Sequence, residues 1–422
     1  MTGTVLIIGT LDTKAKDLRY LQTKLEDEGA RTLLMDVSCK SRPVDEFPGI
    51  SCRTVAMAGG SEFQAVAGLD KISAVQVMIK GATKVTKGLC DEGKIQGVIG
   101  LGGANGAEIA CAVMRALPVG FPKVMVTCVA SGNTRPYVGA KDIIMVNSIG
   151  DISLNRITKR IMVNAARAIA HMANGAPFHE DVTRPQICIS TFGTTLPCVE
   201  RAKEQLENEG YEVIELHASG TGGIALEELV SSGEISGVLD ITTSELVDDL
   251  VDGMYSAGPH RLEAAGRMGI PQVISLGALD FGNFGGKETI PPRFRDRSFF
   301  FYTPSITLMR TSVEESRILG ERMAMKANRA VGPTAIVVPL RGFSALDREG
   351  GKKMVAIDGR VRGEWHDEAA NRALIDSMKA HLDSSRVFLM EMDAHINDPL
   401  FADSAAHLLV RLMGEKTGKL SC

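Results

Sequence analysis

Short apolar runs alternate with helix-like segments along the first half of the chain, and each run ends near glycine or polar residues. Residues 5–8 form the first run, which ends at Gly9. Behind it, leucines recur at spacings of three and four, which predicts an amphipathic helix. The same pattern predicts strands at 32–37, 97–101 and 124–129 and helices at 64–89, 108–117 and 152–173. Such alternation is typical of a parallel sheet.

The pattern restarts after a polar, proline-marked segment at 176–185, which we interpret as a hinge. Three segments match between the halves in the same order: 26–29 with 207–210, 93–99 with 233–239, and 121–124 with 270–273. The second half is predicted to contain strands at 186–191, 299–302, 334–339 and 386–392 and helices at 194–209, 312–329, 368–382 and 398–414. Two related modules and chance similarity of βα units both explain the matches.

These elements predict an α/β protein with two Rossmann-like, doubly wound modules and mostly parallel sheets. We expect an N-terminal nucleotide-binding module at 1–180 and a C-terminal α/β module with extra strands at 185–422. The length of 422 residues agrees with two or three domains.

Composition excludes several other classes of protein. The chain is 44% hydrophobic and 23% charged, which is ordinary for a globular protein and excludes disordered, collagen-like and coiled-coil chains. Its formal net charge of -4 gives no indication of a basic surface that would bind nucleic acid. An aromatic content of 5% argues against a surface on which the bases of single-stranded nucleic acid stack. The 44 glycines exceed the usual share and predict many tight turns.

The chain shows no membrane or secretory signal. No apolar run approaches the ~18 residues of a membrane helix. The first residues lack the basic region and cleavage site of a secretory signal. None of the eight cysteines is spaced C-x-x-C, and most, including Cys111, Cys128 and Cys188, stand in apolar runs, as reduced core thiols do. We therefore expect a cytoplasmic protein without a membrane partner.

The first strand-to-helix junction is a candidate ligand site, because open α/β sheets bind ligands at the carboxyl ends of their strands. It contains Gly9, Thr10, Asp12, Thr13 and Lys14. Free amides at the helix start suit a phosphate, Lys14 adds a positive charge, and Asp12 or Thr13 offers an oxygen to Mg²⁺. An ordinary helix N-cap explains the same residues, and no Walker A sequence occurs.

Three further junctions of the first module carry glycine and polar residues. Residues 100–106 read G-x-G-x-x-x-G, one residue longer than the dinucleotide fingerprint, so a nucleotide or a simple turn fits them. Residues 131–134, followed by Arg135, fit an anion, a purine edge or a plain polar loop. The last junction, residues 147–151, stands just before the next predicted helix. We expect Asp151 or Ser153 to cap that helix. The candidate binding residues here are Gly102, Gly103, Asn105, Gly106, Ser131, Gly132, Asn133 and Thr134.

In the second module, His217 stands beside a glycine turn after a predicted strand, where proton transfer is feasible. His395 lies in a similar place, between two aspartates, and either a proton-transfer group, a metal site or a capping loop fits that segment, although no standard metal spacing occurs. Asp240 and Asp280 end other strands. Our candidate catalytic residues are His217, Arg341, Ser344 and His395, although Ser344 lacks the G-x-S-x-G elbow of a serine hydrolase.

Five segments together resemble one family: residues 5–14, 100–106, 129–134, 340–347 and 393–399. It is the bacterial family of uncharacterised proteins that is similar to the N-terminal inhibitory domain of the tomato mosaic virus resistance protein. The resemblance covers nearly the whole chain. It implies a two-subdomain α/β fold, ATP with Mg²⁺ as ligand, and self-association as a homodimer or higher oligomer. It carries ATP binding only to the matching loops, Gly9 to Lys14, Gly102 to Gly106 and Ser131 to Thr134, and does not carry over the antiviral role.

Three functional hypotheses follow. The preferred one is a Mg-nucleotide-binding protein, with or without an ATP-dependent reaction on a small metabolite between the modules. The second is a nucleotide-independent lyase, hydrolase or isomerase of a hydroxy- or sugar-acid, in which the glycine turns hold a carboxylate or phosphate. The third is a non-catalytic interaction or sensor module.

Overall fold

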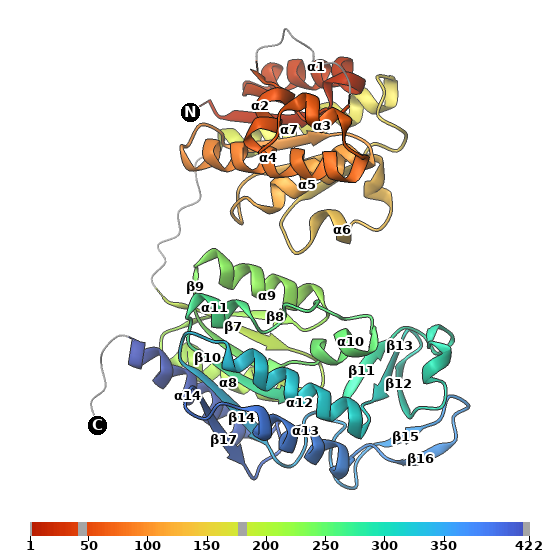
Figure 1. The fold of residues 1–422 in the computed structure, drawn as a ribbon, viewed down its shortest axis with the longest axis vertical. Coiled ribbons are helices and arrows are strands. Elements are labelled where there is room, and N and C mark those ends of the chain that lie inside the picture. The colour runs from red at the N-terminus through yellow and green to blue at the C-terminus, as the bar shows by residue number, and fades with distance from the viewer. Residues whose placement is uncertain (1, 41–48, 176–183, 417–422) are drawn as a thin grey trace. The chain divides into compact units, whose positions relative to one another are not determined.

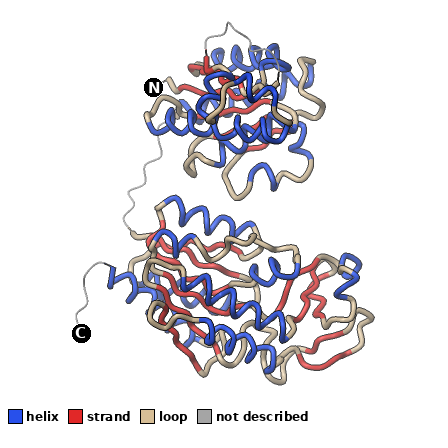
Figure 2. The backbone as a smooth tube through the Cα atoms, in the orientation of Figure 1, coloured by secondary structure: helices blue, strands red, loops and turns tan. Residues whose placement is uncertain are grey.

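The computed structural model describes residues 2–40, 49–175 and 184–416. The chain divides into two compact units, residues 1–180 and 181–422, each with helices packed on a sheet (Figures 1 and 2). Most of the predicted hinge, residues 176–183, lies outside the described residues.

The first unit contains a six-stranded sheet with the order β3-β2-β1-β4-β5-β6, and all its paired strands run parallel. Residues Val5 to Ile8 of the central strand are fully buried, which explains their continuous apolar run. The strands are β1 (Thr4–Gly9), β2 (Arg31–Asp36), β3 (Gly49–Ile50), β4 (Gly97–Leu101), β5 (Lys123–Thr127) and β6 (Ile144–Asn147).

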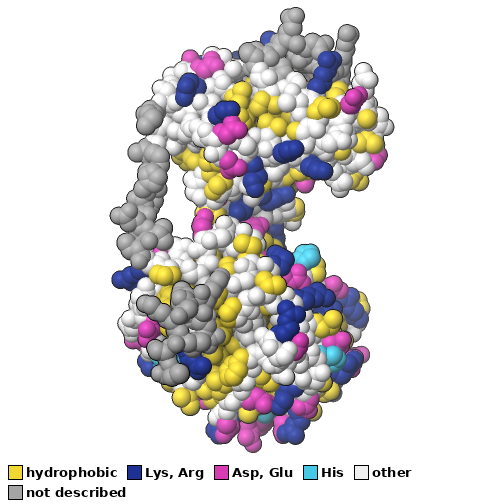
Figure 3. All heavy atoms as spheres, turned by 60° about the vertical axis from the view of Figure 1, so that its left-hand side comes forward, with side chains coloured by type: hydrophobic (Ala, Val, Ile, Leu, Met, Phe, Trp, Pro, Cys, Tyr) yellow, Lys and Arg dark blue, Asp and Glu magenta, His cyan; other side chains and the backbone are white. Residues whose placement is uncertain are grey.

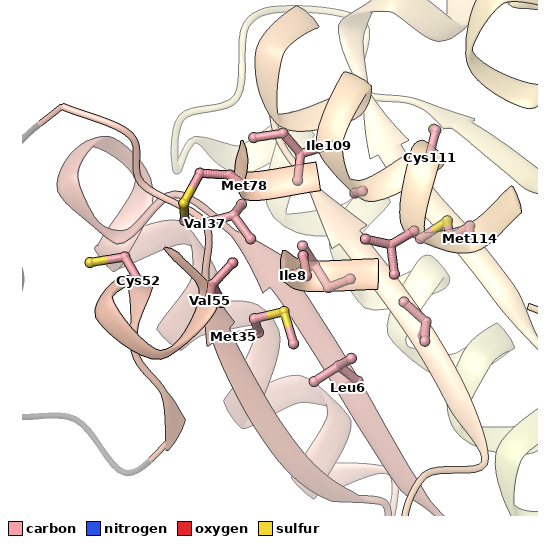
Figure 4. Packing of buried hydrophobic residues seen from close by; sticks show 14 of the residues in the cluster. Leu6, Ile8, Met35, Val37, Cys52, Val55, Met78, Ile109, Cys111 and Met114 are labelled. Carbon is pink, nitrogen blue, oxygen red and sulfur yellow. The ribbon is translucent and has the colours of Figure 1, made fainter. Parts of the chain in front are cut away.

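Helices cover both faces of this sheet. On one face, α1 and α7 pack against strand residues such as Ile7 and Val124. On the other, Leu6 and Ile8 face side chains from α2, α4 and α5, including Val55 and Met78 (Figure 4). The helices are α1 (Leu11–Asp27), α2 (Cys52–Ala58), α3 (Phe63–Gly68), α4 (Lys71–Asp91), α5 (Ala104–Arg115), α6 (Arg135–Val138) and α7 (Arg156–Asn174), with the 3₁₀ turn η1 (Cys128–Ser131).

Two predicted helices of this unit have different bounds. The single helix expected at 64–89 is two helices, because Asp70 starts α4 by accepting hydrogen bonds from the amides of Ile72 and Ser73. The helix expected from residue 152 begins at Arg156. Its N-cap is Asn155, in a capping box with Thr158, and not Asp151 or Ser153.

The second unit contains another six-stranded sheet with the order β17-β14-β10-β9-β7-β8, again with all pairs parallel. The order β2-β1-β4-β5 in the first sheet corresponds to β8-β7-β9-β10 in the second. The three pairs of matching sequence segments lie just before or at the start of equivalent strands. The strands are β7 (Gln186–Thr191), β8 (Glu212–His217), β9 (Ile235–Thr242), β10 (Gln272–Gly277), β14 (Thr334–Pro339) and β17 (Val387–Met392).

A five-stranded antiparallel sheet, which the sequence pattern did not predict, completes the second unit in the order β11-β13-β12-β15-β16. The strand expected at 299–302 belongs to it. Its strands are β11 (Phe281–Phe284), β12 (Phe299–Thr303), β13 (Ile306–Arg310), β15 (Lys353–Val355) and β16 (Val361–Glu364). The two parallel sheets confirm the predicted α/β, Rossmann-like fold class.

The helices of the second unit again lie on both faces of the parallel sheet. Residues of α8 and α14 share one core cluster, and those of α12 and α13 share another. The helices are α8 (Leu196–Asn208), α9 (Thr221–Ser232), α10 (Glu245–Val251), α11 (Ala264–Met268), α12 (Val313–Asn328), α13 (Glu368–His381) and α14 (Pro399–Lys416), with 3₁₀ turns η2 (Lys287–Thr289) and η3 (Pro292–Phe294). Among the described residues, no helix is long and apolar enough to cross a bilayer.

Candidate functional site

The strand order of the first unit places a topological switch point between β1 and β4, because the chain leaves these neighbours toward opposite sides of the sheet. The segments that follow β1, β4 and β5 therefore lie at the carboxyl ends of adjacent strands. Gly9 lies close to the end of β4, since a Cβ atom there would come within 3.1 Å of the Leu101 carbonyl oxygen. The fold thus brings the three predicted binding segments to one edge.

The helix start at the first junction does not offer free amides, so this part of the prediction is wrong. The Leu11 amide donates to Asp36 Oδ1 at 3.0 Å, and the Asp12 amide donates to Ser38 Oγ at 3.2 Å. The amides of Thr13 and Lys14 both donate to the Thr10 carbonyl. Asp36, the acidic residue at the end of β2, thus binds the protein's own backbone, and the four amides that open α1 are not available to a ligand.

Those side chains include one candidate magnesium ligand. Asp12 Oδ1 is buried without a hydrogen-bond partner among the described residues, so it has a lone pair available for a cation or its water. Thr10 and Thr13 join their hydroxyls at 2.9 Å. Lys14 Nζ donates to the Ile152 carbonyl and lies 3.7 Å from Asp151. One free carboxylate oxygen fits Mg²⁺, which commonly takes one or two protein carboxylates together with water and phosphate oxygens.

The second junction does offer free amides. Within residues 2–40, 49–175 and 184–416, no hydrogen-bond acceptor meets the backbone N–H groups of Ala104, Asn105 or Gly106, which open α5. A Cβ atom at Gly102 would lie 2.8 Å from Gly106 Cα, so glycine is required for this tight entry. At Gly103 a Cβ atom would meet nothing within 4 Å, which leaves the backbone open to a ligand.

The third junction is an exposed loop held by its own hydrogen bonds. Ser131 Oγ donates to the Cys128 carbonyl at 3.1 Å, and Asn133 Oδ1 accepts from the Arg135 amide at 3.2 Å. The Gly132 amide donates to the Val129 carbonyl, whereas Thr134 is partly buried. Of the predicted residues here, the Ser131 and Asn133 side chains are the exposed polar groups at the end of β5.

In the second unit, a cavity of 1170 Å³ lies beside α13 and the residues that follow β14, β16 and β17. It brings together two predicted residues, Arg341 and His395, which both line it. Ser344, the third predicted residue of this region, is not among the lining residues. It is fully buried, and its hydroxyl donates to Asp280 Oδ2 at 2.8 Å. His217 is the last residue of β8, at the opposite edge of the sheet, where its ring lies 5.1 Å from that of Phe192, so it does not belong to this group.

Hydrogen bonds engage both ring nitrogens of His395. Nδ1 accepts from the Asn397 amide at 3.1 Å, so the neutral ring carries its proton on Nε2, which donates to the Ser344 carbonyl at 3.0 Å. Burial, together with the nearby Arg348, lowers the pKa of His395. Arg341 forms an exposed, two-bond ion pair with Asp393. These contacts give His395 and Arg341 partners within the protein.

The sequence analysis missed a second cavity histidine, His366. Its Nδ1 bonds Asp347 Oδ1 at 2.8 Å, and the Asp347 side chain is fully buried. His366 follows β16, a short and largely exposed strand that the apolar pattern does not predict, so no sequence signal pointed to this histidine. Asp347 ends the segment 340–347 on which the family resemblance rested. Among the described residues, no group of three metal-ligating side chains is assembled, so the metal site considered around His395 gains no support.

Family models match almost the whole chain. Residues 3–177 match the N-terminal domain of the uncharacterised protein family UPF0261, and residues 184–413 match its C-terminal domain. The chain belongs to this family. A UPF0261 protein from Clostridium tetani is 42% identical over 415 residues, 98% of this chain and 100% of that protein. The UPF0261 protein RA0729 from Rhizobium meliloti is 39% identical over 404 residues, 95% of this chain and 97% of that one.

The predicted resemblance to the tomato protein is confirmed. The ToMV resistance protein Tm-1(GCR237) of Solanum lycopersicum is 34% identical over 426 residues, 95% of this chain and 54% of the tomato protein. This UPF0261 chain therefore spans about half the length of that relative. Among solved structures, UDP-N-acetylglucosamine 2-epimerase from Rickettsia bellii aligns at 11% identity and a TM-score of 0.23, over 65% of this chain and 78% of that one. An alignment this loose carries no functional argument.

Proposed function

We propose that the N-terminal unit binds ATP as its magnesium complex at the carboxyl edge of its sheet, with the phosphates against the start of α5. The observation that carries this proposal is the set of unpartnered amides of Ala104, Asn105 and Gly106 in the part of the chain that the structure describes. Consecutive free N–H groups at the positive end of a helix dipole form an anion site.

The glycines in front of this helix favour a phosphate over a bulky neutral group. Open space at Gly103 lets phosphate oxygens approach the backbone, while Gly102 packs against Gly106 and fixes the direction of the helix start. The proposal thus moves the phosphates from β1, where the amides are occupied, to β4. A dinucleotide fits less well, because its glycine loop follows the first strand and its ribose needs a free carboxylate at the end of the second.

The side chains around this edge match the remaining parts of the ligand. Asp12, with its unpartnered buried oxygen, is the candidate for contact with Mg²⁺ or its water shell. Bound Mg²⁺ neutralises phosphate charge and orients the phosphate oxygens. Ser131 and Asn133 are polar and exposed at the end of β5, so they can contact the sugar or base. The resemblance stated from the sequence favours ATP over other phosphate ligands.

Thermal unfolding of the full chain with and without ATP and MgCl₂ tests the proposal. We expect the melting temperature to rise with ATP concentration, since a ligand at a hundred times its Kd stabilises the native state by about 2.7 kcal/mol. Inorganic phosphate and NAD⁺ should act much more weakly. An unchanged melting temperature at millimolar Mg-ATP contradicts the proposal.

A matched pair of glycine variants locates the site. Gly103→Val places a side chain in open space at the helix start, so the protein should fold but bind ATP at least tenfold more weakly. Gly88→Ala also adds a side chain in open space, but inside α4, and should leave the ATP Kd unchanged. Equal ATP affinity in both variants contradicts the placement of the phosphates at α5.

A further inference from the structure

We propose that His366 is a general base, positioned by Asp347, and that the cavity it lines in the second unit binds a polyhydroxylated small molecule, a sugar or sugar acid. This site lies in a different unit from the proposed nucleotide site, so each of the two proposals can be tested without the other.

The dyad geometry defines the protonation state of the His366 ring. Asp347 Oδ1 accepts a hydrogen bond from Nδ1 at 2.8 Å, while its Oδ2 accepts from the Phe343 amide at 2.9 Å and from Asn371 Nδ2 at 2.8 Å. Because Asp347 is thus held as an acceptor, the neutral ring carries its proton on Nδ1. Nε2 then keeps its lone pair, and no group among the described residues bonds it. A carboxylate behind a histidine in this way is how enzymes orient a general base.

The surrounding charges favour proton uptake by His366. The hydrogen bond to Asp347 raises the pKa of His366 against the opposing effect of partial burial; Glu349 also raises it and Arg310 lowers it. Burial opposes ionisation of Asp347, yet the hydrogen bond from His366 and the charge of Arg310 lower its pKa below the usual range. An ionised Asp347 therefore stabilises the imidazolium that forms when Nε2 accepts a proton.

His395, the other histidine of the cavity, does not compete for this role, because internal hydrogen bonds occupy both its nitrogens. His366 is thus the one cavity histidine in the described chain with an unbonded ring nitrogen.

The cavity lining indicates the class of ligand. Among the described residues that line it, only Leu340 and Ile375 are apolar, and the rest can donate or accept hydrogen bonds. Hydroxyl groups do both, so a polyol matches such a lining better than an aromatic or lipid molecule. Figure 3 likewise shows acidic and basic side chains interspersed on one face of this unit. The polar lining residues are Arg341, Arg348, Glu349, Glu364, His366, Glu368, Asn371, Arg372, Asp376, Lys379, Glu391, His395 and Asp398.

The step this arrangement supports is a reversible proton transfer. Nε2 takes the proton from the carbon next to the carbonyl group of a hydroxyaldehyde, and the C–H electron pair forms the carbon–carbon double bond of an enediolate, with the charge on oxygen. The proton returns from Nε2 to carbon, so atoms and electrons balance without an oxidant or cofactor. In D₂O the returning nucleus is deuterium.

Imidazole ¹⁵N NMR of the full chain tests the dyad without a ligand. We expect neutral His366 to be protonated on Nδ1, with a pKa above ~6.5, the value of a free histidine, and Asp347→Asn to lower that pKa. The His366→Gln variant assigns the resonance. His381, whose Nδ1 contacts the Ser377 carbonyl at 2.8 Å, is the control, and its ¹⁵N resonances should be unchanged in Asp347→Asn. An Nε2-protonated His366, or a pKa insensitive to Asp347→Asn, overturns the dyad.

Ligand titration and isotope exchange test the chemistry. D-ribose, D-glucose and D-glucuronate are the probes, and benzoate is the apolar acid control. We expect at least one sugar probe to shift the His366 resonance and to gain deuterium at C2 at least tenfold faster than in buffer. His366→Gln should abolish the excess exchange. Shifts by benzoate alone, or exchange unaffected by His366→Gln, overturn the proposal, as does the absence of any sugar effect.

Discussion

Arg261 donates two parallel hydrogen bonds to Asp240, at 2.5 Å and 2.7 Å, and neither residue is appreciably exposed to solvent. Arg261 Nε also donates to Glu245 at 2.6 Å, and Glu245 accepts from the amides of Gly220 and Gly223. The network ties β9, α10 and the start of α9 together. Asp240, which the sequence analysis placed at the end of a strand, lies within β9 and is a structural partner of Arg261.

Removing the Arg261 cation should destabilise the second unit strongly. In Arg261→Met, Asp240 and Glu245 stay buried without a counter-ion, so we expect the free energy of unfolding to fall by about 3–5 kcal/mol. Urea denaturation measures this. Arg317→Met is the control, because Arg317 and Glu314 form an exposed pair, and its effect on the free energy of unfolding should be far smaller. Similar losses in both variants would contradict a special role for the buried network.

The contribution of Asp248 to stability should fall as the pH rises toward neutrality. Burial raises its pKa to about 7, against hydrogen bonds from the Asn283 amide and side chain. The folded state therefore holds this proton more tightly than the unfolded state. The stabilisation is complete below pH ~4 and is lost as the pH rises through about 7, by on the order of 4 kcal/mol. Urea titrations between pH 4 and 8 should show a shallower decline in Asp248→Asn than in the wild type.

The apolar pattern was enough to predict central strands of both parallel sheets, such as β1, β4, β7 and β14, because these strands are almost fully buried and read as continuous apolar runs. It did not predict the short edge strands β3 and β6, which are partly exposed. It was not enough for the antiparallel sheet. Strands such as Lys353–Val355 and Val361–Glu364 are short and largely exposed, so they leave no periodic signal. The break between α3 and α4 was missed because the apolar spacing continues across it, while the deciding event is local capping by Asp70.

The sequence was enough to predict which segments lie together at the candidate site, but not which backbone amides there are free. Glycine and polar residues after β1 and β4 were predicted to lie together, and the strand order does bring these segments to the carboxyl edge of one sheet. The sequence did not show that Asp36 and Ser38, about 25 residues away, occupy the amides after β1. The partnership of Asp347 with His366 was hidden for the same reason, since it joins two loops through a contact that neither local pattern specifies.

Two glycines of α4 should respond to alanine in opposite directions. A Cβ atom at Gly81 would lie 1.9 Å from the Val55 carbonyl oxygen of α2, whereas one at Gly88 would meet nothing within 4 Å. Gly81→Ala must therefore separate the two helices, at a cost of about 1–3 kcal/mol. Gly88→Ala should stabilise by up to about 1 kcal/mol, because alanine loses less backbone entropy in a helix. Thermal unfolding measures both, and a neutral Gly81→Ala would show that α2 and α4 are less closely packed.

Thiol labelling should divide the described cysteines into two groups. Cys52, Cys111, Cys188 and Cys198 are buried, and burial raises the pKa of Cys111 to about 11 and that of Cys188 to about 12. Since the thiolate is the reactive form, these two should react with Ellman's reagent on the order of a hundredfold or more slowly than a free thiol at pH 8. Cys128, which is partly exposed, should react first. Peptide mapping by mass spectrometry assigns each site, and 8 M urea supplies the unprotected rate. Native labelling of Cys111 at the rate seen in urea would contradict the close packing of α5 on the sheet.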